Sequence, residues 1–226
     1  MRSEDIEFKS NGDQASGFLV RPDSDDPVPG VVVIQEWWGL NAHIRDVTTR
    51  VAAEGFVALA PDLYHGKVVA EPNDAQKASM ELDRPRAMRE IGGAAAYLKA
   101  QPYVAPKTIG IIGFCMGGGI ALWIAAHNPD IGAAVAFYGG GSPEASAFAN
   151  SKAAILNING ERDVRVTTTI KALDEDLKAY SLVHKMIVYP GGEHAFFNDA
   201  RPEVYNPEAS KDAWQQAIGW FRKYLV

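Results

Sequence analysis

The sequence has a single cysteine among its 226 residues and no cluster of lysines and arginines. One cysteine cannot form a disulfide within the chain, so nothing in the composition points to an oxidising compartment. The formal net charge of -6 argues against nucleic acid or an anionic membrane as a partner. The stretch 1–5 lacks the apolar core of a secretion signal. We therefore expect a cytoplasmic protein without nucleic-acid or membrane partners, and a monomer.

Long apolar stretches are also scarce. Residues 109–126 come nearest to the length of a membrane span, because they include no charged side chain. Glycines at 113 and 117–119 interrupt this stretch, and its pattern changes there from strand-like to helix-like. Two short elements inside a protein core explain the stretch better than one spanning helix.

What is present is an ordinary globular composition, with 47% hydrophobic and 22% charged residues. Strand and helix patterns alternate along the chain. Strands are expected at 5–9, 16–20, 30–34, 56–60, 109–112, 132–138, 153–159 and 185–189. A helix capped by Asn41 and ended by Gly55 is expected, with further helices at 86–100, 119–126, 167–180 and 208–223 and a loop carrying short helices at 62–82. This alternation predicts one α/β domain over residues 1–226, with a doubly wound, mostly parallel sheet and helices on both faces.

The pentapeptide Gly113-Phe114-Cys115-Met116-Gly117 is the most informative motif. A strand, a sharp turn and a helix with glycines at this spacing are typical of a nucleophile elbow, here with cysteine in place of serine. The glycines let strand and helix approach each other closely. At the start of a helix, the dipole and the free N–H groups favour a thiolate at Cys115. The alternative is a buried, inert cysteine beside a tight turn.

A cysteine nucleophile needs a base, and the base needs an acid that orients it. His194 lies in a glycine-rich loop after one predicted strand, and Asp163 lies in the turn after another. Both are therefore expected at the carboxyl edge of the sheet, where open α/β folds bind ligands. Glu161 in the same turn is the alternative acid. The order Cys115, Asp163, His194 along the chain is that of the α/β-hydrolases.

The remaining histidines fall on or near helices, before a strand or in a loop, and surface or supporting roles are expected for them: His43, His65, His127 and His184. No set of histidine, cysteine and carboxylate residues has the spacing of metal ligands. We expect neither a metal nor a cofactor.

The chain resembles the dienelactone hydrolase family over nearly all of its length. The matching stretches are Gln35–Gly39, Pro61–Tyr64, Gly113–Gly118, Tyr138–Gly139, Gly160–Asp163 and His194–Phe196. The cysteine elbow together with Glu36 is specific, since many esterases have an elbow but few pair a cysteine with that glutamate. The resemblance implies an α/β-hydrolase fold and a hydrolase of small esters or lactones.

The resemblance also implies roles for individual residues. Cys115 would be the nucleophile that forms an acyl-cysteine intermediate, His194 the base and Asp163 its partner. Glu36 would contact the thiol in the resting enzyme and keep it mostly uncharged until substrate binds.

Backbone N–H groups of Trp37 and Met116 would form the oxyanion hole, since two preorganised donors stabilise a developing oxyanion. Aromatic residues, among them Trp38, Tyr138 and Phe196, are expected to supply an apolar substrate pocket.

One departure from the family concerns the substrate. Well-known members hold a substrate carboxylate with two arginines, one on a helix after the Pro-Asp-Leu-Tyr stretch and one four residues beyond the histidine. The second position is Asn198 here, and no arginine lies between Tyr64 and Asp83. The sequence therefore predicts little preference for carboxylate-bearing substrates over neutral ones. Three arginines could replace the missing pair only if the loops bring them to the site: Arg84, Arg86 and Arg201.

Two other functions stay open. The chain could be a general carboxylesterase of small substrates with no preference for lactones. It could also be a regulatory protein in which Cys115 is oxidised reversibly and hydrolysis is vestigial. The complete set of Cys115, His194 and Asp163 argues against the second, because a sensor thiol does not need an oriented histidine.

Overall fold

In the computed structural model, which describes residues 1–24 and 26–225, the described strands form one eight-stranded sheet. Its spatial order is β1-β2-β4-β3-β5-β6-β7-β8. β1 and β2 pair antiparallel, β2 joins β4 antiparallel, and every pairing from β4 to β8 is parallel. The strands are β1 (Arg2–Ser10), β2 (Asp13–Arg21), β3 (Gly30–Ile34), β4 (Val57–Pro61), β5 (Ile109–Phe114), β6 (Ile131–Phe137), β7 (Ala154–Gly160) and β8 (His184–Tyr189). The predicted fold class is confirmed.

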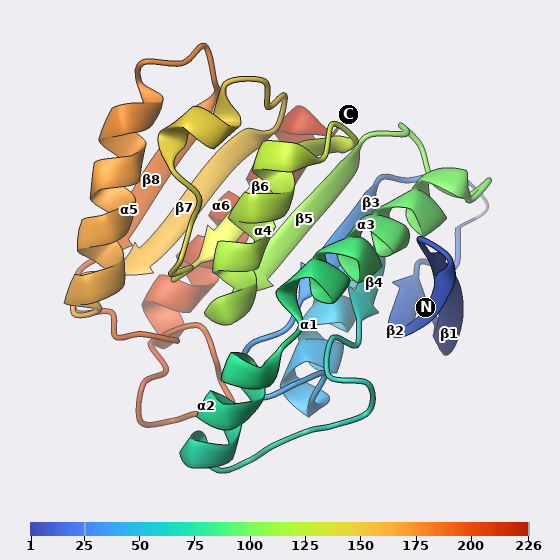
Figure 1. The fold of residues 1–226 in the computed structure, drawn as a ribbon, viewed down its shortest axis with the longest axis horizontal. Coiled ribbons are helices and arrows are strands. Elements are labelled where there is room, and N and C mark those ends of the chain that lie inside the picture. The colour runs from blue at the N-terminus through green and yellow to red at the C-terminus, as the bar shows by residue number, and fades with distance from the viewer. Residues whose placement is uncertain (25, 226) are drawn as a thin grey trace.

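Helices cover both faces of the sheet. The helical elements are α1 (Ala42–Ala53), α2 (Pro72–Glu81), α3 (Arg84–Ala100), α4 (Met116–His127), the 3₁₀ turn η1 (Ala145–Phe148), α5 (Val164–Leu177) and α6 (Pro207–Tyr224). α3, α4 and α5 lie on one face, and α1 and α6 lie on the other (Figure 1). α2 lies beyond the carboxyl ends of the parallel strands (Figure 1).

The central strands are buried on both faces, which explains their continuous apolar runs. Along β5, Ile109 and Ile111 pack into the core under α3 and α4. Ile112 and Phe114 pack into the core under α1 and α6. Because successive side chains of a strand point to opposite faces, one apolar run fills both cores.

Capping side chains set the helix boundaries. Asn41 accepts a hydrogen bond from the Ile44 N–H at 3.1 Å, so α1 begins where the sequence predicts. Asp83 accepts one from the Arg86 N–H at 3.0 Å, so α3 begins at Arg84, earlier than predicted. Within 62–82, the expected short helical structure is α2.

The uncharged stretch 109–126 is divided as predicted, between the strand β5 and the helix α4. Within the described part of the chain, no helix combines the length and the apolar character that crossing a membrane requires.

Candidate active site

Cys115 lies at the junction of β5 and α4, in a sharply turned backbone conformation. Its φ of 54° and ψ of -118° are unusual for a residue with a side chain. A Cβ at Gly113 would overlap the carbonyl oxygen of Gly117, and a Cβ at Gly117 would overlap that of Gln35. The close packing of strand and helix therefore requires glycine at both positions, and it exposes the half-buried Cys115 at the carboxyl edge of the sheet.

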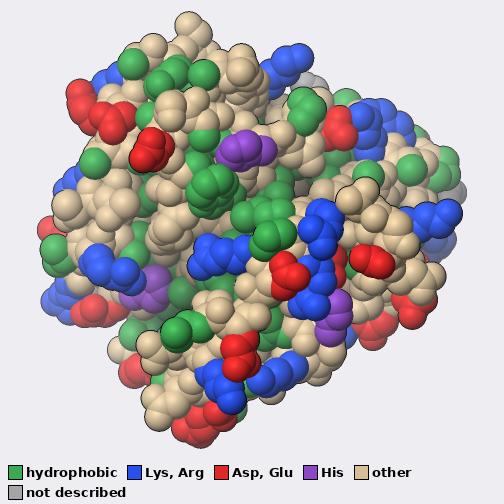
Figure 2. Space-filling view, in the orientation of Figure 1, with side chains coloured by type: hydrophobic (Ala, Val, Ile, Leu, Met, Phe, Trp, Pro, Cys, Tyr) green, Lys and Arg blue, Asp and Glu red, His purple; other side chains and the backbone are tan. Residues whose placement is uncertain are grey.

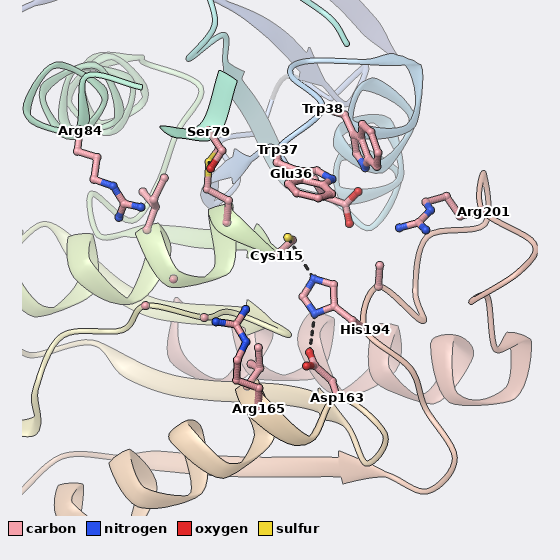
Figure 3. A pocket seen from close by; sticks show the side chains of 17 residues that line it. Glu36, Trp37, Trp38, Ser79, Arg84, Cys115, Asp163, Arg165, His194 and Arg201 are labelled. Carbon is pink, nitrogen blue, oxygen red and sulfur yellow. Dashed lines mark hydrogen bonds and ion pairs between the residues drawn. The ribbon is translucent and has the colours of Figure 1, made fainter. Parts of the chain in front are cut away.

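A hydrogen-bonded chain runs from Cys115 through His194 to Asp163 (Figure 3). The Nε2 atom of His194 lies 3.1 Å from the Cys115 Sγ, and its Nδ1 lies 2.5 Å from Asp163 Oδ2. Asp163 follows β7 as the residue that precedes α5, and His194 lies in the loop after β8. The structure thus brings together three residues that the sequence placed at the ends of separate strands.

The environment of His194 favours its protonated form. Burial lowers its pKa, but the hydrogen bonds to Asp163 and Cys115 and the charges of both groups outweigh burial and raise the pKa of His194 to about 10. The protonated, imidazolium form of His194 is therefore favoured near neutral pH.

Glu161, the alternative acid, does not face His194. It is exposed, and its Oε2 accepts a hydrogen bond from the Gly191 N–H at 2.9 Å. This contact ties the turn after β7 to the loop that carries His194. Asp163 is therefore the carboxylate that contacts His194, and Glu161 contacts only the loop that carries His194.

Glu36 follows β3 and is only 2% exposed. Its Oε2 accepts a hydrogen bond from Asn198 Nδ2 at 2.8 Å, and its Oε1 accepts one from the Tyr138 hydroxyl at 3.4 Å. Burial raises the pKa of Glu36, although these hydrogen bonds and the positive charges of His194 and Arg201 oppose the shift.

The sequence predicted that Glu36 contacts the Cys115 thiol, whereas in the structure the hydrogen-bond partners of Glu36 are Asn198 and Tyr138. Among the described residues, no hydrogen bond joins Glu36 to Cys115, whose Sγ pairs with His194 instead. Both oxygens of the Glu36 carboxyl group are held by Asn198 and Tyr138, which explains the difference. Asn198 was not predicted as a supporting residue, and no local pattern marks it.

Trp37 and Met116 line the same cavity as Cys115, and each has a backbone N–H group. Met116 is the first residue of α4, and N–H groups in the first turn of a helix have no partner within the helix. Within residues 1–24 and 26–225, neither the Trp37 nor the Met116 N–H donates a hydrogen bond. Both N–H groups are therefore unpaired among the described residues.

A cavity of about 530 Å³ opens over Cys115 and His194. Trp37 and Trp38 line it, with their rings 5.2 Å apart in an edge-on arrangement. The other lining residues are Glu36, Ser79, Arg84, Cys115, Met116, Gly119, Ile120, Gly140, Gly141, Asp163, Arg165, Val166, His194, Ala195 and Arg201.

The predicted pocket residues Tyr138 and Phe196 are not part of this lining, which corrects the sequence prediction. Both side chains are completely buried. The Tyr138 ring lies 5.1 Å from the His194 ring and 5.8 Å from the Phe196 ring. These aromatic residues belong to the hydrophobic core cluster that also includes Phe114, Phe137 and apolar residues of α6. Of the three predicted pocket residues, Trp38 alone lines the cavity.

The structure also decides among the arginines. Arg84 and Arg201 line the cavity, whereas Arg86 lies 3.5 Å from Glu90 and faces elsewhere. Arg165 and Ser79 line it too and were not predicted. Their only signal in the sequence is position, since Arg165 stands two residues after Asp163.

The other four histidines pair outside the cavity: His43 with Asp199, His65 with Glu90, His127 with the carbonyl of Trp123, and His184 with Asp174. Among the described residues, no three histidine, cysteine or carboxylate side chains are placed to hold a metal ion.

A parallel sheet with an elbow after β5, an acid after β7 and a histidine after β8 defines an α/β-hydrolase. The model of the dienelactone hydrolase family matches residues 15–225. The chain belongs to this family and is a hydrolase.

Known relatives extend over the whole chain. "Protein usf" of Aquifex pyrophilus is 36% identical, with 98% of each chain covered. A protein of Aquifex aeolicus (strain VF5) named "Putative carboxymethylenebutenolidase" is 34% identical, covering 97% of this chain and 98% of that one. The crystal structure titled "Putative Dienelactone Hydrolase" from Klebsiella pneumoniae subsp. pneumoniae MGH 78578 has a TM-score of 0.88 at 30% identity, with 99% of each chain covered.

Proposed function

We propose that this protein hydrolyses small carboxylic esters or lactones through an acyl-cysteine intermediate. The observation that carries the proposal is the hydrogen-bonded chain Cys115–His194–Asp163 inside a cavity. A thiol, a base and an orienting acid in this geometry are the components of nucleophilic acyl transfer. The free N–H groups of Trp37 and Met116 support the same reaction.

In the acylation step, the Cys115 sulfur attacks the carbonyl carbon as a thiolate. The carbonyl π electrons move to oxygen, and the N–H groups of Trp37 and Met116 stabilise the oxyanion that forms. When the oxyanion collapses, the bond to the alkoxide breaks. His194 gives its Nε2 proton to the leaving alkoxide, and the acyl group stays on Cys115. In a lactone, the alkoxide remains attached to the acyl chain.

In the deacylation step, neutral His194 accepts a proton from water through Nε2 while the water oxygen attacks the thioester carbon. Collapse of the second oxyanion breaks the carbon–sulfur bond and restores the thiolate beside the imidazolium ion. The carboxylic acid leaves the cavity. Asp163 holds the ring in the tautomer that presents Nε2 to the substrate and stabilises its charged form.

Glu36 has a separate place in this proposal. Its buried carboxyl group lines the same cavity as the thiol, so its ionised form disfavours a second negative charge on Cys115. Because Asn198 and Tyr138 hold Glu36, it would act on the thiol through its charge and not by direct contact.

The test uses 4-nitrophenyl acetate and the intact protein. Wild-type enzyme is expected to release 4-nitrophenolate, and a brief reaction stopped with acid should leave one acetyl group on Cys115 by peptide mass spectrometry. One equivalent of iodoacetamide on Cys115 should abolish turnover. Full activity after stoichiometric labelling, or in a Cys115→Ala variant, would contradict the mechanism.

A panel of neutral lactones and aryl esters then defines the substrate class. Faster turnover of lactones favours a lactone hydrolase, and equal turnover favours a general carboxylesterase. No turnover of any member would contradict the proposal and favour a regulatory thiol.

A further inference from the structure

The carboxyl group of Asp199 joins the loop after β8 to helix α1. Its Oδ2 accepts a hydrogen bond from the Arg50 Nη2 at 2.5 Å, and its Oδ1 lies 3.2 Å from the His43 Nδ1. Burial raises the pKa of Asp199, but the hydrogen bond from Arg50 and the charges of Arg50 and His43 outweigh burial and hold this pKa below its usual value. Asp199 therefore contacts α1 as a carboxylate at neutral pH.

Asp199 directly follows Asn198, the residue that holds Glu36. Asn198 is buried, and its Nδ2 donates a hydrogen bond to the Glu36 Oε2 at 2.8 Å. Residues 190–206, between β8 and α6, form turns and loop. The chain is anchored just before Asn198 by the buried Phe197 and just after it by Asp199. The position of the Asn198 side chain therefore depends on both anchors.

The contribution of this cluster to stability does not explain its presence. The side chains of Asp199 and Arg50 are 31% and 38% exposed, and ion pairs at such exposure contribute little to the free energy of unfolding. His43 is buried, and burial lowers its pKa although Asp199 opposes the shift, so a neutral imidazole lies against the carboxylate. Burying this polar ring costs free energy. The cluster is explained better by the position that it gives to the loop.

Asp199 and Arg50 act from outside the cavity. The cavity opens between α2 and the N-terminal ends of α4 and α5 (Figure 2), and neither residue lines it. Arg50 belongs to α1, which follows the loop that carries Glu36, whereas Asp199 lies in the loop that carries His194. The cluster therefore connects the two parts of the chain whose side chains meet at the buried Glu36 carboxyl group.

We propose that Asp199 is a positioning residue, which holds the Asn198 side chain on the Glu36 carboxyl group and thereby sets the charge beside Cys115. The Asn198 hydrogen bond favours the ionised form of Glu36, against the burial that raises the pKa of this group. When Asp199 no longer holds the loop, this hydrogen bond weakens and Glu36 shifts toward its neutral form. Neutral Glu36 does not oppose a thiolate, so the Cys115 thiolate forms at lower pH. The effect on turnover rests on the proposed hydrolysis, whereas the effect on the thiol does not.

The first measurement is the pH dependence of Cys115 alkylation by iodoacetamide, because the thiolate is the reacting form. In Asp199→Asn, the midpoint should move to lower pH by about half a unit, which makes the reaction about threefold faster below the midpoint. Asn198→Ala should move the midpoint in the same direction. Adding Asp199→Asn to Asn198→Ala or to Glu36→Gln should move it no further, since the contact that Asp199 supports is then already lost.

Two further variants separate position from direct charge. Arg50→Gln removes a positive charge, whose direct effect on the thiol would move the midpoint to higher pH. Because this variant also releases Asp199, its midpoint is expected to move to lower pH, as in Asp199→Asn. Asp46→Asn is the matched control, since Asp46 pairs with Arg50 within α1, and its midpoint should equal that of the wild type. Opposite shifts in Asp199→Asn and Arg50→Gln, or as large a shift in Asp46→Asn, would overturn the positioning role.

The second measurement is kcat/KM for 4-nitrophenyl acetate as a function of pH. Its acidic limb reports ionisation of the free enzyme and should shift in Asp199→Asn by the same amount as the alkylation midpoint. A shifted alkylation midpoint without turnover of any ester would leave the positioning role standing and contradict the proposed function. Turnover with wild-type midpoints in both Asp199→Asn and Arg50→Gln would overturn the positioning role and leave the proposed hydrolysis intact.

Discussion

At the scale of single residues, the buried carboxyl group of Glu36 depends on two neutral donors. Replacing Asn198 by alanine removes the shorter hydrogen bond, of 2.8 Å, and leaves a buried carboxyl oxygen without a partner. The free energy of unfolding is expected to fall by about 1–3 kcal/mol, measured by urea denaturation. The loss should be smaller in a Glu36→Gln background, where no buried charge remains. Equal losses in both backgrounds would show that Asn198 acts through packing alone.

The hydrogen-bonded chain Cys115–His194–Asp163 predicts how far kcat falls when each of its members is replaced. Asp163→Asn leaves a base whose tautomer and orientation are no longer fixed, so kcat for an aryl ester is expected to fall about 10²–10⁴-fold. His194→Ala removes the proton carrier itself and should cost at least as much. Glu161→Gln is the matched control, since Glu161 contacts the Gly191 N–H and not His194. A larger loss of kcat from Glu161→Gln than from Asp163→Asn would show that Asp163 is not the acid that orients His194.

At the scale of elements, the elbow is the point where sequence and structure agree best. The need for glycine at positions 113 and 117 is visible in five consecutive residues. The pentapeptide around Cys115 therefore predicts the turn, the strand before it and the helix after it. The start of α3 is encoded locally as well, by Asp83, but the sequence prediction placed it two residues late. Tyr138 and Phe196 could not be distinguished from pocket residues, because their core cluster includes residues that are distant in the sequence, among them those of α6.

The elbow also yields a prediction for stability. In Gly117→Ala, the added Cβ would overlap the Gln35 carbonyl oxygen, which is backbone and cannot move aside alone. Loss of folded protein, or of activity together with a lower free energy of unfolding, is expected. Gly92→Ala in α3 is the control, because a Cβ there meets no atom within 4 Å. That variant should be neutral or more stable by up to about 1 kcal/mol. A Gly117→Ala protein as stable and active as Gly92→Ala would contradict the packing argument.

At the scale of the whole molecule, the sequence predicts the mixture of elements but not their spatial neighbours. The parallel sheet follows from alternating patterns, whereas the pairing of Glu36 with Asn198, 162 residues away, has no local signal. The lining of the cavity has no local signal in the sequence either. Ser79, Arg84 and Arg165 come from three helices that meet only in the folded chain. Cys115 and Asp163 follow strand ends and lie at the predicted edge of the sheet, whereas the helix residues Ser79 and Arg165 were not predicted to line the cavity.

Folding as a whole is coupled to the charge of His194. Its pKa rises from 6.5 to about 10 in the folded protein, so the folded state holds the proton more tightly. The resulting stabilisation is fully present below about pH 6.5 and is lost as pH rises to about 10. The difference in free energy of unfolding between wild type and His194→Gln, from urea denaturation, should therefore be largest near pH 6 and shrink steadily toward pH 10. Groups that do not contact His194 contribute to the stability of both proteins alike, so the difference reports His194 together with its partners Asp163 and Cys115. A difference that stays constant or grows over this range would show that the imidazolium ion is not stabilised by Asp163 and Cys115.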